Sequence, residues 1–162
     1  MKIGASLLLN ILIGLVWYAL QPASSPGSFI LGVVVGYVVL AVLHRPYGRR
    51  TMWALRFVGF LLLAIGKSSL AVAAVVLRPQ LHLDQGIVSI PLTVSSDFEI
   101  ATLATAITLT PGTLSVDVGQ EGGRRVLYVH NLVVGDPEKI RREIQEEFEQ
   151  RILRFTRSEP PQ

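Results

Sequence analysis

The apolar stretch IGASLLLNILIGLVWYALQPASSPGSFILGVVVGYVVLAVL, residues 3–43, decides the fold because it contains no charged side chain over 41 positions. The segment QPASSPG interrupts it, so two membrane helices are predicted at residues 3–20 and 28–43. At about 1.5 Å per residue they are ~27 and ~24 Å long, against a hydrocarbon core of ~30 Å. A cleaved signal peptide is the alternative for the first helix, but no A-x-A-like site follows it and further apolar segments do.

A third apolar stretch, residues 51–77, is long enough to cross a membrane but contains Arg56 and Lys67. Lys67 lies near its middle, where an unpaired cation costs roughly 2.5–3.5 kcal/mol on insertion scales. Two arrangements avoid that cost. In one, the lysine faces a carboxylate of another chain or a wet cavity; in the other, the helix is tilted or lies partly at the interface and the lysine reaches the headgroups. The residues alone favour neither arrangement.

Charge is divided unevenly along the chain. Residues 1–83 carry seven basic side chains and no Asp or Glu, whereas residues 84–162 carry eight basic and twelve acidic ones. The positive excess therefore lies in the apolar half, where it indicates membrane topology rather than a nucleic-acid partner. Four arginines in residues 44–56 predict that this loop and the N-terminus are cytoplasmic. We expect the C-terminal half to be cytoplasmic too, a placement that a third full span would contradict.

The membrane region is assigned to residues 1–78, and residues 79–157 are predicted to form a small α+β domain of order β-α-β-β-α. Strands are expected at residues 87–94, 113–118 and 125–132, with a hairpin between the second and third. Pro91 would require the first strand to lie at a sheet edge or to bulge. With about 75 residues, the helices are expected to cover one sheet face.

Two helices of this domain have clear start signals. Ser96 and Glu99 form a capping box that opens a short helix, and Asp136-Pro137 supplies an N-cap followed by proline at the first helical position. The apolar stripe of the longer helix consists of Ile140, Ile144, Phe148, Ile152 and Phe155. Its charged residues between positions 141 and 149 are expected on the solvated face. Residues 158–162 are expected to form a loose tail.

The residue types exclude several kinds of chemistry. A cation or proton pathway through lipid normally needs buried Asp, Glu or His, and the membrane half has no carboxylate, so this chain cannot build a complete relay alone. The histidines accompany no nucleophile motif, no H-E-x-x-H and no phosphate-binding loop, so no enzyme activity, metal site or cofactor is predicted. His130, on a predicted strand, is interpreted as structural.

The segment Thr108-Leu109-Thr110-Pro111-Gly112-Thr113 has an unusually specific choice of residues. Proline sets φ at the second position of a turn and glycine supplies positive φ at the third, which predicts a type II turn. The threonines can bond to the turn backbone. Plain turn chemistry is the favoured interpretation, and a docking loop that presents hydroxyl groups to a partner is the alternative.

This segment, continuing as Leu114-Ser115-Val116-Asp117 and followed by Leu127-Tyr128-Val129-His130, resembles the E subunits of the multisubunit Mrp-type (Mnh-type) Na+/H+ antiporter family. The apolar hairpin and the run from Lys67 to Ala73 resemble that family as well. The resemblance implies a small component of a plasma-membrane complex that exchanges sodium for protons. It also implies that the pumping pathways reside in large, polytopic antiporter-like subunits.

The sequence is therefore interpreted as a multi-pass accessory subunit of a monovalent cation/proton antiporter complex. Its expected partners are the other subunits and membrane lipid, and its expected role is assembly and stability. The candidate interaction or structural residues are Lys67, Thr108, Thr110, Pro111, Gly112, Thr113 and His130. The rival hypothesis is a membrane-anchored binding or assembly module unrelated to transport.

Overall fold

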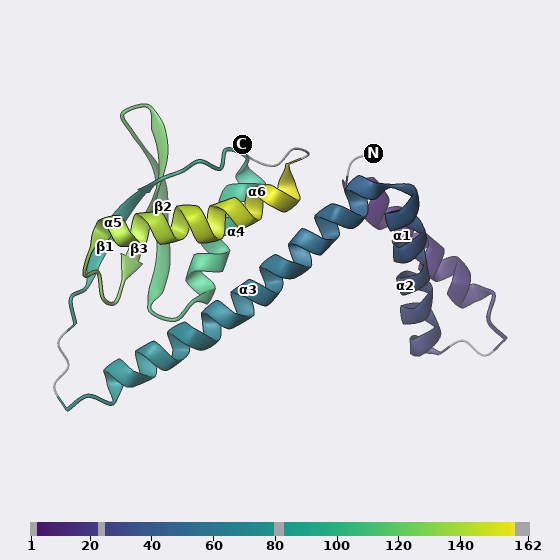
Figure 1. Ribbon diagram of the computed structural model, residues 1–162, viewed down its shortest axis with the longest axis horizontal. Helices are drawn as coiled ribbons and strands as arrows, with labels where there is room; N and C mark the ends of the chain where they lie inside the picture. Colours follow the sequence, from purple (N-terminus) through teal and green to yellow (C-terminus); the bar gives the residue numbers. More distant parts are fainter. Residues whose placement is uncertain (1–2, 23–24, 80–82, 158–162) are drawn as a thin grey trace. The chain divides into compact units, whose positions relative to one another are not determined.

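The computed structural model describes residues 3–22, 25–79 and 83–157, and the expected C-terminal tail lies outside these ranges. The chain divides into two compact units, residues 1–53 and 54–162. Helices occupy the N-terminal part of the chain, and a domain with a three-stranded antiparallel sheet follows them (Figure 1). Two of the described helices, Pro26–Leu43 and Arg45–Val76, are long and apolar enough to cross a membrane.

The first unit contains a helical hairpin held by close glycine contacts. Helix α1 covers Ile3–Ala19 and α2 covers Pro26–Leu43. A Cβ placed on Gly32 would lie 2.7 Å from Trp17 Cβ, and one placed on Gly36 would lie 2.5 Å from Asn10 Oδ1. The two glycines form a G-x-x-x-G spacing, which lets membrane helices approach closely without bulky side chains between them.

Helix α3 begins earlier than the sequence predicted. It covers Arg45–Val76, so residues 45–50, expected in a loop, form its first turns, and His44 alone separates it from α2. Proline is compatible with this start because Pro46 lies in the first turn, where its missing N–H costs no helical hydrogen bond. Tyr47 accepts a hydrogen bond from Asn10 Nδ2 at 3.4 Å, which joins this turn to α1 within the first unit.

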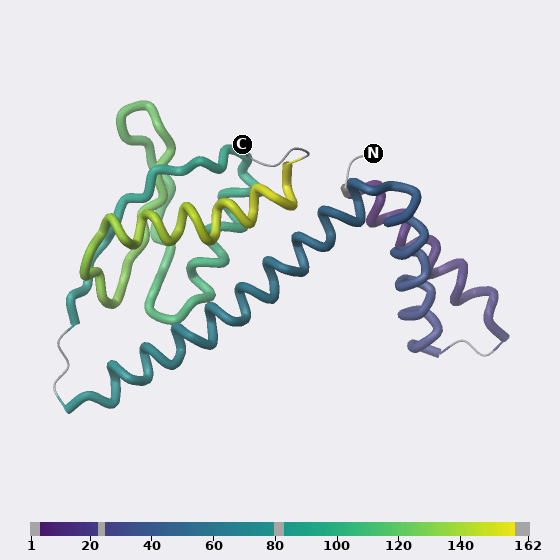
Figure 2. Tube along the Cα trace, in the orientation of Figure 1, coloured from purple at the N-terminus to yellow at the C-terminus, as the bar shows by residue number. Residues whose placement is uncertain are grey.

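The second unit contains an antiparallel sheet of order β1-β3-β2, built from Gly86–Pro91, Arg124–Asn131 and Thr113–Glu121 (Figure 2). Strand β1 lies at the edge, which accommodates Pro91 as predicted. In the register, Val88 lies opposite Val129 and Ile90 opposite Leu127, and all four side chains are buried. The opposite face is open in part, since Ile87 and Leu114 are at least half exposed.

Helix α4, Asp97–Leu109, begins at the predicted capping box, because Ser96 and Glu99 each accept a hydrogen bond from the other's backbone N–H. The last helix has three parts: α5 (Pro137–Glu143), a π-helical segment (Ile144–Glu149) and α6 (Gln150–Thr156). Asp136 caps its start through the Glu138 N–H, as the sequence predicted. The π segment places Glu149 five residues after Ile144 on the inner side, and both are buried.

The part of α3 that belongs to the second unit is one wall of that unit's core. Phe57 is 6% exposed, and its ring centroid lies 5.6 Å from that of Phe155. Phe60 meets Phe148 edge to face at 5.1 Å. Both partners come from the last helix, so these aromatic contacts hold it against α3. The remaining core comes from the inner sheet face and from α4, whose Leu103 is fully buried.

Candidate interaction site

A cavity of about 720 Å³ lies where α3, the turn after α4, the end of β3 and the last helix meet. Five of the residues singled out in the sequence line it: Lys67, Thr110, Pro111, Gly112 and Thr113. Its apolar wall includes Val72 and Val75 of α3 and Ile144 of the last helix. The fold therefore brings Lys67 and the Thr110–Thr113 turn to one place, although more than forty positions separate them in the chain.

The turn itself has the predicted conformation. Gly112 has φ +93, and Thr113 N–H donates to Thr110 C=O at 3.2 Å. The Thr110 and Thr113 hydroxyls both donate to Ile107 C=O at 2.6 Å, and the two hydroxyl oxygens lie 2.7 Å apart. They therefore add to the Thr110 N–H, which also donates to this carbonyl at 3.0 Å at the end of α4. This is the turn chemistry favoured from the sequence, because these hydroxyls have partners within the turn.

Gly112 also touches α3 directly. A Cβ at this position would lie 3.2 Å from Val72 Cγ2, and Gly112 C=O accepts a hydrogen bond from Leu132 N–H at 2.9 Å. Glycine is required here for two reasons: positive φ is unfavourable for other residues, and the backbone approaches a neighbouring helix. The turn is thus fixed both to the strand end and to α3.

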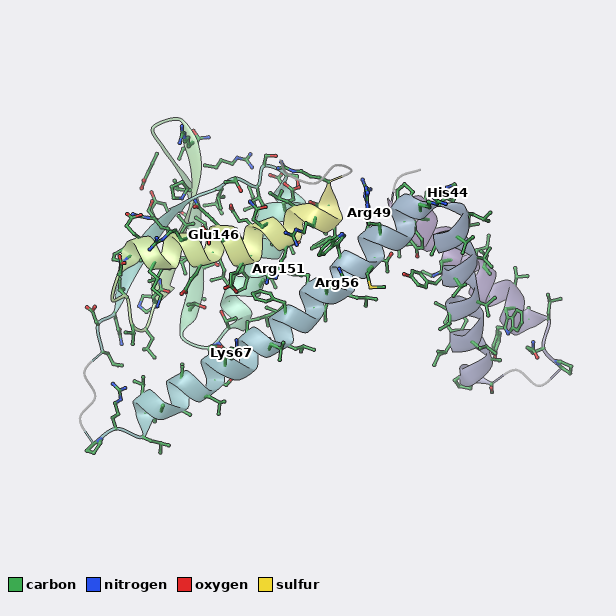
Figure 3. The ribbon with its side chains drawn as sticks, viewed as in Figure 1. His44, Arg49, Arg56, Lys67, Glu146 and Arg151 are labelled. Carbon is green, nitrogen blue, oxygen red and sulfur yellow. The ribbon has the colours of Figure 1, made fainter. Side chains whose placement is uncertain are left out.

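Lys67 lies at the cavity wall with an exposed side chain, and Glu143 of α5 lines the same cavity. Within the described ranges, no carboxylate lies close enough to Lys67 to form an ion pair. Figure 3 shows Lys67 and Arg56 along the same helix, and both are exposed.

Thr108 and His130 do not line this cavity. The Thr108 hydroxyl accepts a hydrogen bond from Ser115 N–H at 3.1 Å and so supports the start of β2. His130 lies on β3 between Ile87 and Leu114 of the flanking strands, on the less covered face of the sheet. Thr108 thus links the end of α4 to β2, and His130 is part of the sheet.

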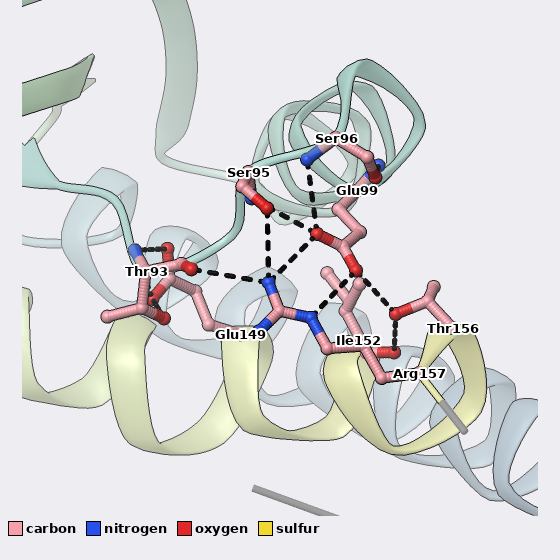
Figure 4. A network of polar contacts seen from close by, with 8 residues as sticks. All are labelled: Thr93, Ser95, Ser96, Glu99, Glu149, Ile152, Thr156 and Arg157. Carbon is pink, nitrogen blue, oxygen red and sulfur yellow. Dashed lines mark hydrogen bonds and ion pairs between the residues drawn. The ribbon is translucent and has the colours of Figure 1, made fainter. Parts of the chain in front are cut away.

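An ion pair that the sequence did not predict fixes the end of α6 (Figure 4). Glu99 is 4% exposed, and its carboxylate accepts from Arg157 Nε at 3.3 Å, Thr156 Oγ1 at 2.8 Å and Ser95 N–H at 3.1 Å. Burial by itself raises the pKa of Glu99, but these donors outweigh it and lower the pKa to about 2. The sequence showed the capping role of Glu99. Its partner lies 58 positions away, beyond any local pattern.

One sequence-based expectation is wrong at Glu149. The sequence predicted that this side chain lies on the solvated face of the last helix, but it is fully buried. Its carboxylate accepts from Thr93 N–H at 3.2 Å and from the Thr93 hydroxyl (Figure 4). Burial raises the pKa of Glu149, and the hydrogen bonds from Thr93 oppose that shift. The π-helical segment Ile144–Glu149 causes this burial. Its wider turn shifts Glu149 away from the outer face that a regular α-helix would give it.

Comparison with known proteins identifies the chain's relatives. Residues 10–155 match the family MNHE, described as Na+/H+ ion antiporter subunit. The chain belongs to this family. The E subunit of the Na+/H+ antiporter of Alkalihalophilus pseudofirmus is 33% identical over 156 residues, which cover 93% of this chain and 98% of that protein. The resemblance to the E subunits of these antiporters that the TLTPGT segment indicated is confirmed.

Two solved structures of membrane complexes also contain chains similar to this member of the MNHE family. A chain of the Mrp complex from Dietzia sp. is 31% identical, with a TM-score of 0.46, and the match covers 65% of this chain and 99% of that one. A chain of an archaeal membrane-bound sulfane sulfur reductase is 23% identical, with a TM-score of 0.53 and coverage of 91% and 96%. The second match shows a shared fold.

Proposed function

We propose that this member of the MNHE family is an accessory component of a multisubunit monovalent cation/proton antiporter complex in the plasma membrane. In this role it contributes to assembly and stability and does not carry the ion pathway alone. The observation that carries the proposal is the absence of any Asp or Glu from residues 1–83. Sodium coordination needs oxygen ligands and proton relays need titratable groups, so its helices lack the means to move either ion.

The cavity residues support a structural role in this proposal. The threonine hydroxyls and Gly112 hold the turn after α4 against α3, and so join the domain to the helix that follows the membrane hairpin. We place the domain in the cytoplasm, because the arginines that follow α2 favour that side for the end of the hairpin. Partners are the other subunits, including large polytopic ones that supply the missing acidic residues.

The test separates an accessory subunit from an independent transporter. Deleting the gene is expected to abolish sodium/proton exchange in membrane vesicles, and expression of the chain in the deletion strain is expected to restore it. The purified chain in liposomes is expected to show no exchange. Exchange by the purified chain alone would contradict the accessory role.

A mild-detergent purification addresses the rival, a membrane-anchored module unrelated to transport. The antiporter proposal requires that a tagged chain co-purify with polytopic subunits that contain acidic residues within their membrane helices. Recovery of the chain without such partners from an actively exchanging membrane would favour the rival.

A further inference from the structure

Helix α3 has two different faces along the part that belongs to the second unit. The residues of the inward face recur every three or four positions, and they are buried or half-buried against the domain. Phe57, Phe60 and Leu61 are examples. The outward face is apolar and open: Leu55 is 59% exposed, Leu62 65% and Leu70 74%. Both faces are therefore apolar, but only one has a protein partner within the described residues.

The domain covers the inward face from Phe57 to Val72, about half of α3. Phe155 packs on Phe57 near one end, and Gly112 lies against Val72 about four turns further on. The covered segment is thus roughly 23 Å long at 1.5 Å per residue. If α3 crossed a bilayer over this segment, the parts of the domain packed against it would lie at the depth of the hydrocarbon core.

Those parts of the domain are unsuited to hydrocarbon. The Arg151 guanidinium carbon lies 4.1 Å from the centre of the Phe60 ring, and Glu143 lines the cavity beside α3 (Figure 3 labels Arg151). Charged side chains at bilayer depth are costly, and lipid-exposed loops and open sheet edges do not occur there. The contacts between α3 and its own domain therefore argue against a spanning orientation.

The basic residues occupy the boundary between the two faces. Arg56 and Lys67 lie eleven residues apart, close to three helical turns, so they form a line along one side of the helix, and Arg78 follows two residues after the helix ends. On a helical wheel this line falls between the inward face at Phe57 and the outward face at Gly66. An apolar face bordered on one side by cations suits a helix that lies in the headgroup region of an anionic membrane.

We propose that α3, from Leu55 to Val76, lies along the cytoplasmic membrane interface rather than across the bilayer. Its outward face contacts the upper part of the acyl chains, the basic line contacts lipid phosphates, and the domain stands in water on the inward face. The helix follows α2 after a single residue, so it starts where a spanning α2 leaves the bilayer. The occupant of the outward face is thus lipid.

This arrangement also allows the C-terminal half to be cytoplasmic, which a third full span would contradict. With α1 and α2 as the spans, the N-terminus, the arginine-rich start of α3 and the domain all lie on one side, as the positive-inside rule requires. Lys67 then needs no partner carboxylate, since its side chain reaches the headgroups. The inference rests on the packing of α3 and does not depend on the proposed role in antiport.

Three small residues on the outward face make a direct test possible. Gly59, Gly66 and Ala73 are spaced by seven residues, or about 10 Å along the helix, and all are exposed. A Cβ added at Gly59 or Gly66 meets nothing within 4 Å. Because the native chain has no cysteine, each can carry a single nitroxide label as Gly59→Cys, Gly66→Cys or Ala73→Cys in the full chain, reconstituted in nanodiscs containing phosphatidylglycerol.

Oxygen and nickel-chelate accessibilities then give the depth of each label. The interfacial arrangement predicts the same shallow depth at all three positions, within a few ångströms. A spanning helix predicts depths that differ by about 10 Å between neighbouring positions, and that result would overturn the proposal. Labels that are fully exposed to water would also overturn the proposal, because water would then cover the outward face of α3. Labels shielded from both reagents would overturn it too, because protein would then cover that face.

Gln120→Cys, on the exposed β2 strand end, is the water-phase control. The measurement needs no other subunit, so a failure of the proposed antiporter role leaves its outcome unaffected. Conversely, a spanning α3 would leave the family assignment intact.

Discussion

Gly112 rests on Val72: a Cβ at position 112 would come within 3.2 Å of the Val72 Cγ2 methyl group, in a residue whose φ is already +93. The turn of the Thr108–Thr113 segment is therefore a contact between the α+β domain and α3. Two separate penalties apply to any substitution at this position, one from the backbone conformation and one from the neighbouring helix.

Gly112→Ala is expected to destabilise the second unit by roughly 1–3 kcal/mol, because alanine is strained at positive φ and must displace Val72. Gly123→Ala is the matched control, since Gly123 has φ +78 but an added Cβ meets nothing within 4 Å. Amide hydrogen exchange of the full chain measures both effects. Equal losses of protection in the two variants would show that the contact with Val72 contributes nothing.

Glu99→Gln should make the domain less stable at neutral pH, by roughly 2–3 kcal/mol, and the deficit should shrink in acid. The sign follows from the lowered pKa: the Glu99 carboxylate contributes stability above its ordinary pKa of 4.5, and this is lost as the pH falls toward about 2. Amide exchange of α4 at pH 7 and pH 3 checks this. An identical deficit at both pH values would contradict the ion-pair explanation.

Glu149→Gln is expected to have the opposite pH profile. Because burial raises the pKa of Glu149, its neutral form is favoured in the folded state, and its contribution declines as the pH rises through that raised value. The variant should therefore gain stability relative to the native chain on going from pH 4 to pH 8. Glu147→Gln, an exposed neighbour, is the control, and a similar relative gain in both variants would refute the role of burial.

Gly36→Leu should separate the α1–α2 hairpin, because a Cβ at Gly36 already lies 2.5 Å from Asn10 Oδ1 and 3.0 Å from Ile13 Cγ2. Overpacking of this kind costs about 1–3 kcal/mol. Electron–electron distance measurements between spin labels on α1 and α2 should show a longer, broader distribution. Gly4→Leu, where an added Cβ meets nothing within 4 Å, should leave the distribution unchanged.

Lys67→Ala should have little effect on exchange or on the yield of the complex if its side chain reaches the headgroups, and Lys67→Arg should resemble the native chain. A surface cation near anionic lipid contributes about 1 kcal/mol. The measurement is sodium/proton exchange in vesicles, together with the amount of complex recovered. A large loss with Lys67→Ala would instead favour a carboxylate partner in another subunit.

Much of this architecture could be predicted from local patterns. The interrupted apolar run predicted α1 and α2, the capping box at Ser96 predicted the start of α4, and Asp136-Pro137 predicted the start of α5. Pro111-Gly112 predicted a turn with positive φ at Gly112, which the structure has. These signals are local because caps, turns and apolar periods involve residues within a few positions of one another.

Tertiary structure alone decided what the local patterns left open. The apolar period of α3 is the same for a spanning helix and for one covered by its own domain, so only the contacts of Phe57 and Val72 distinguish them. The pairing of Glu99 with Arg157 and the burial of Glu149 also depend on segments more than fifty residues apart. Sequence therefore determined the elements and the absence of carboxylates from the membrane half, whereas packing determined which faces of those elements meet protein.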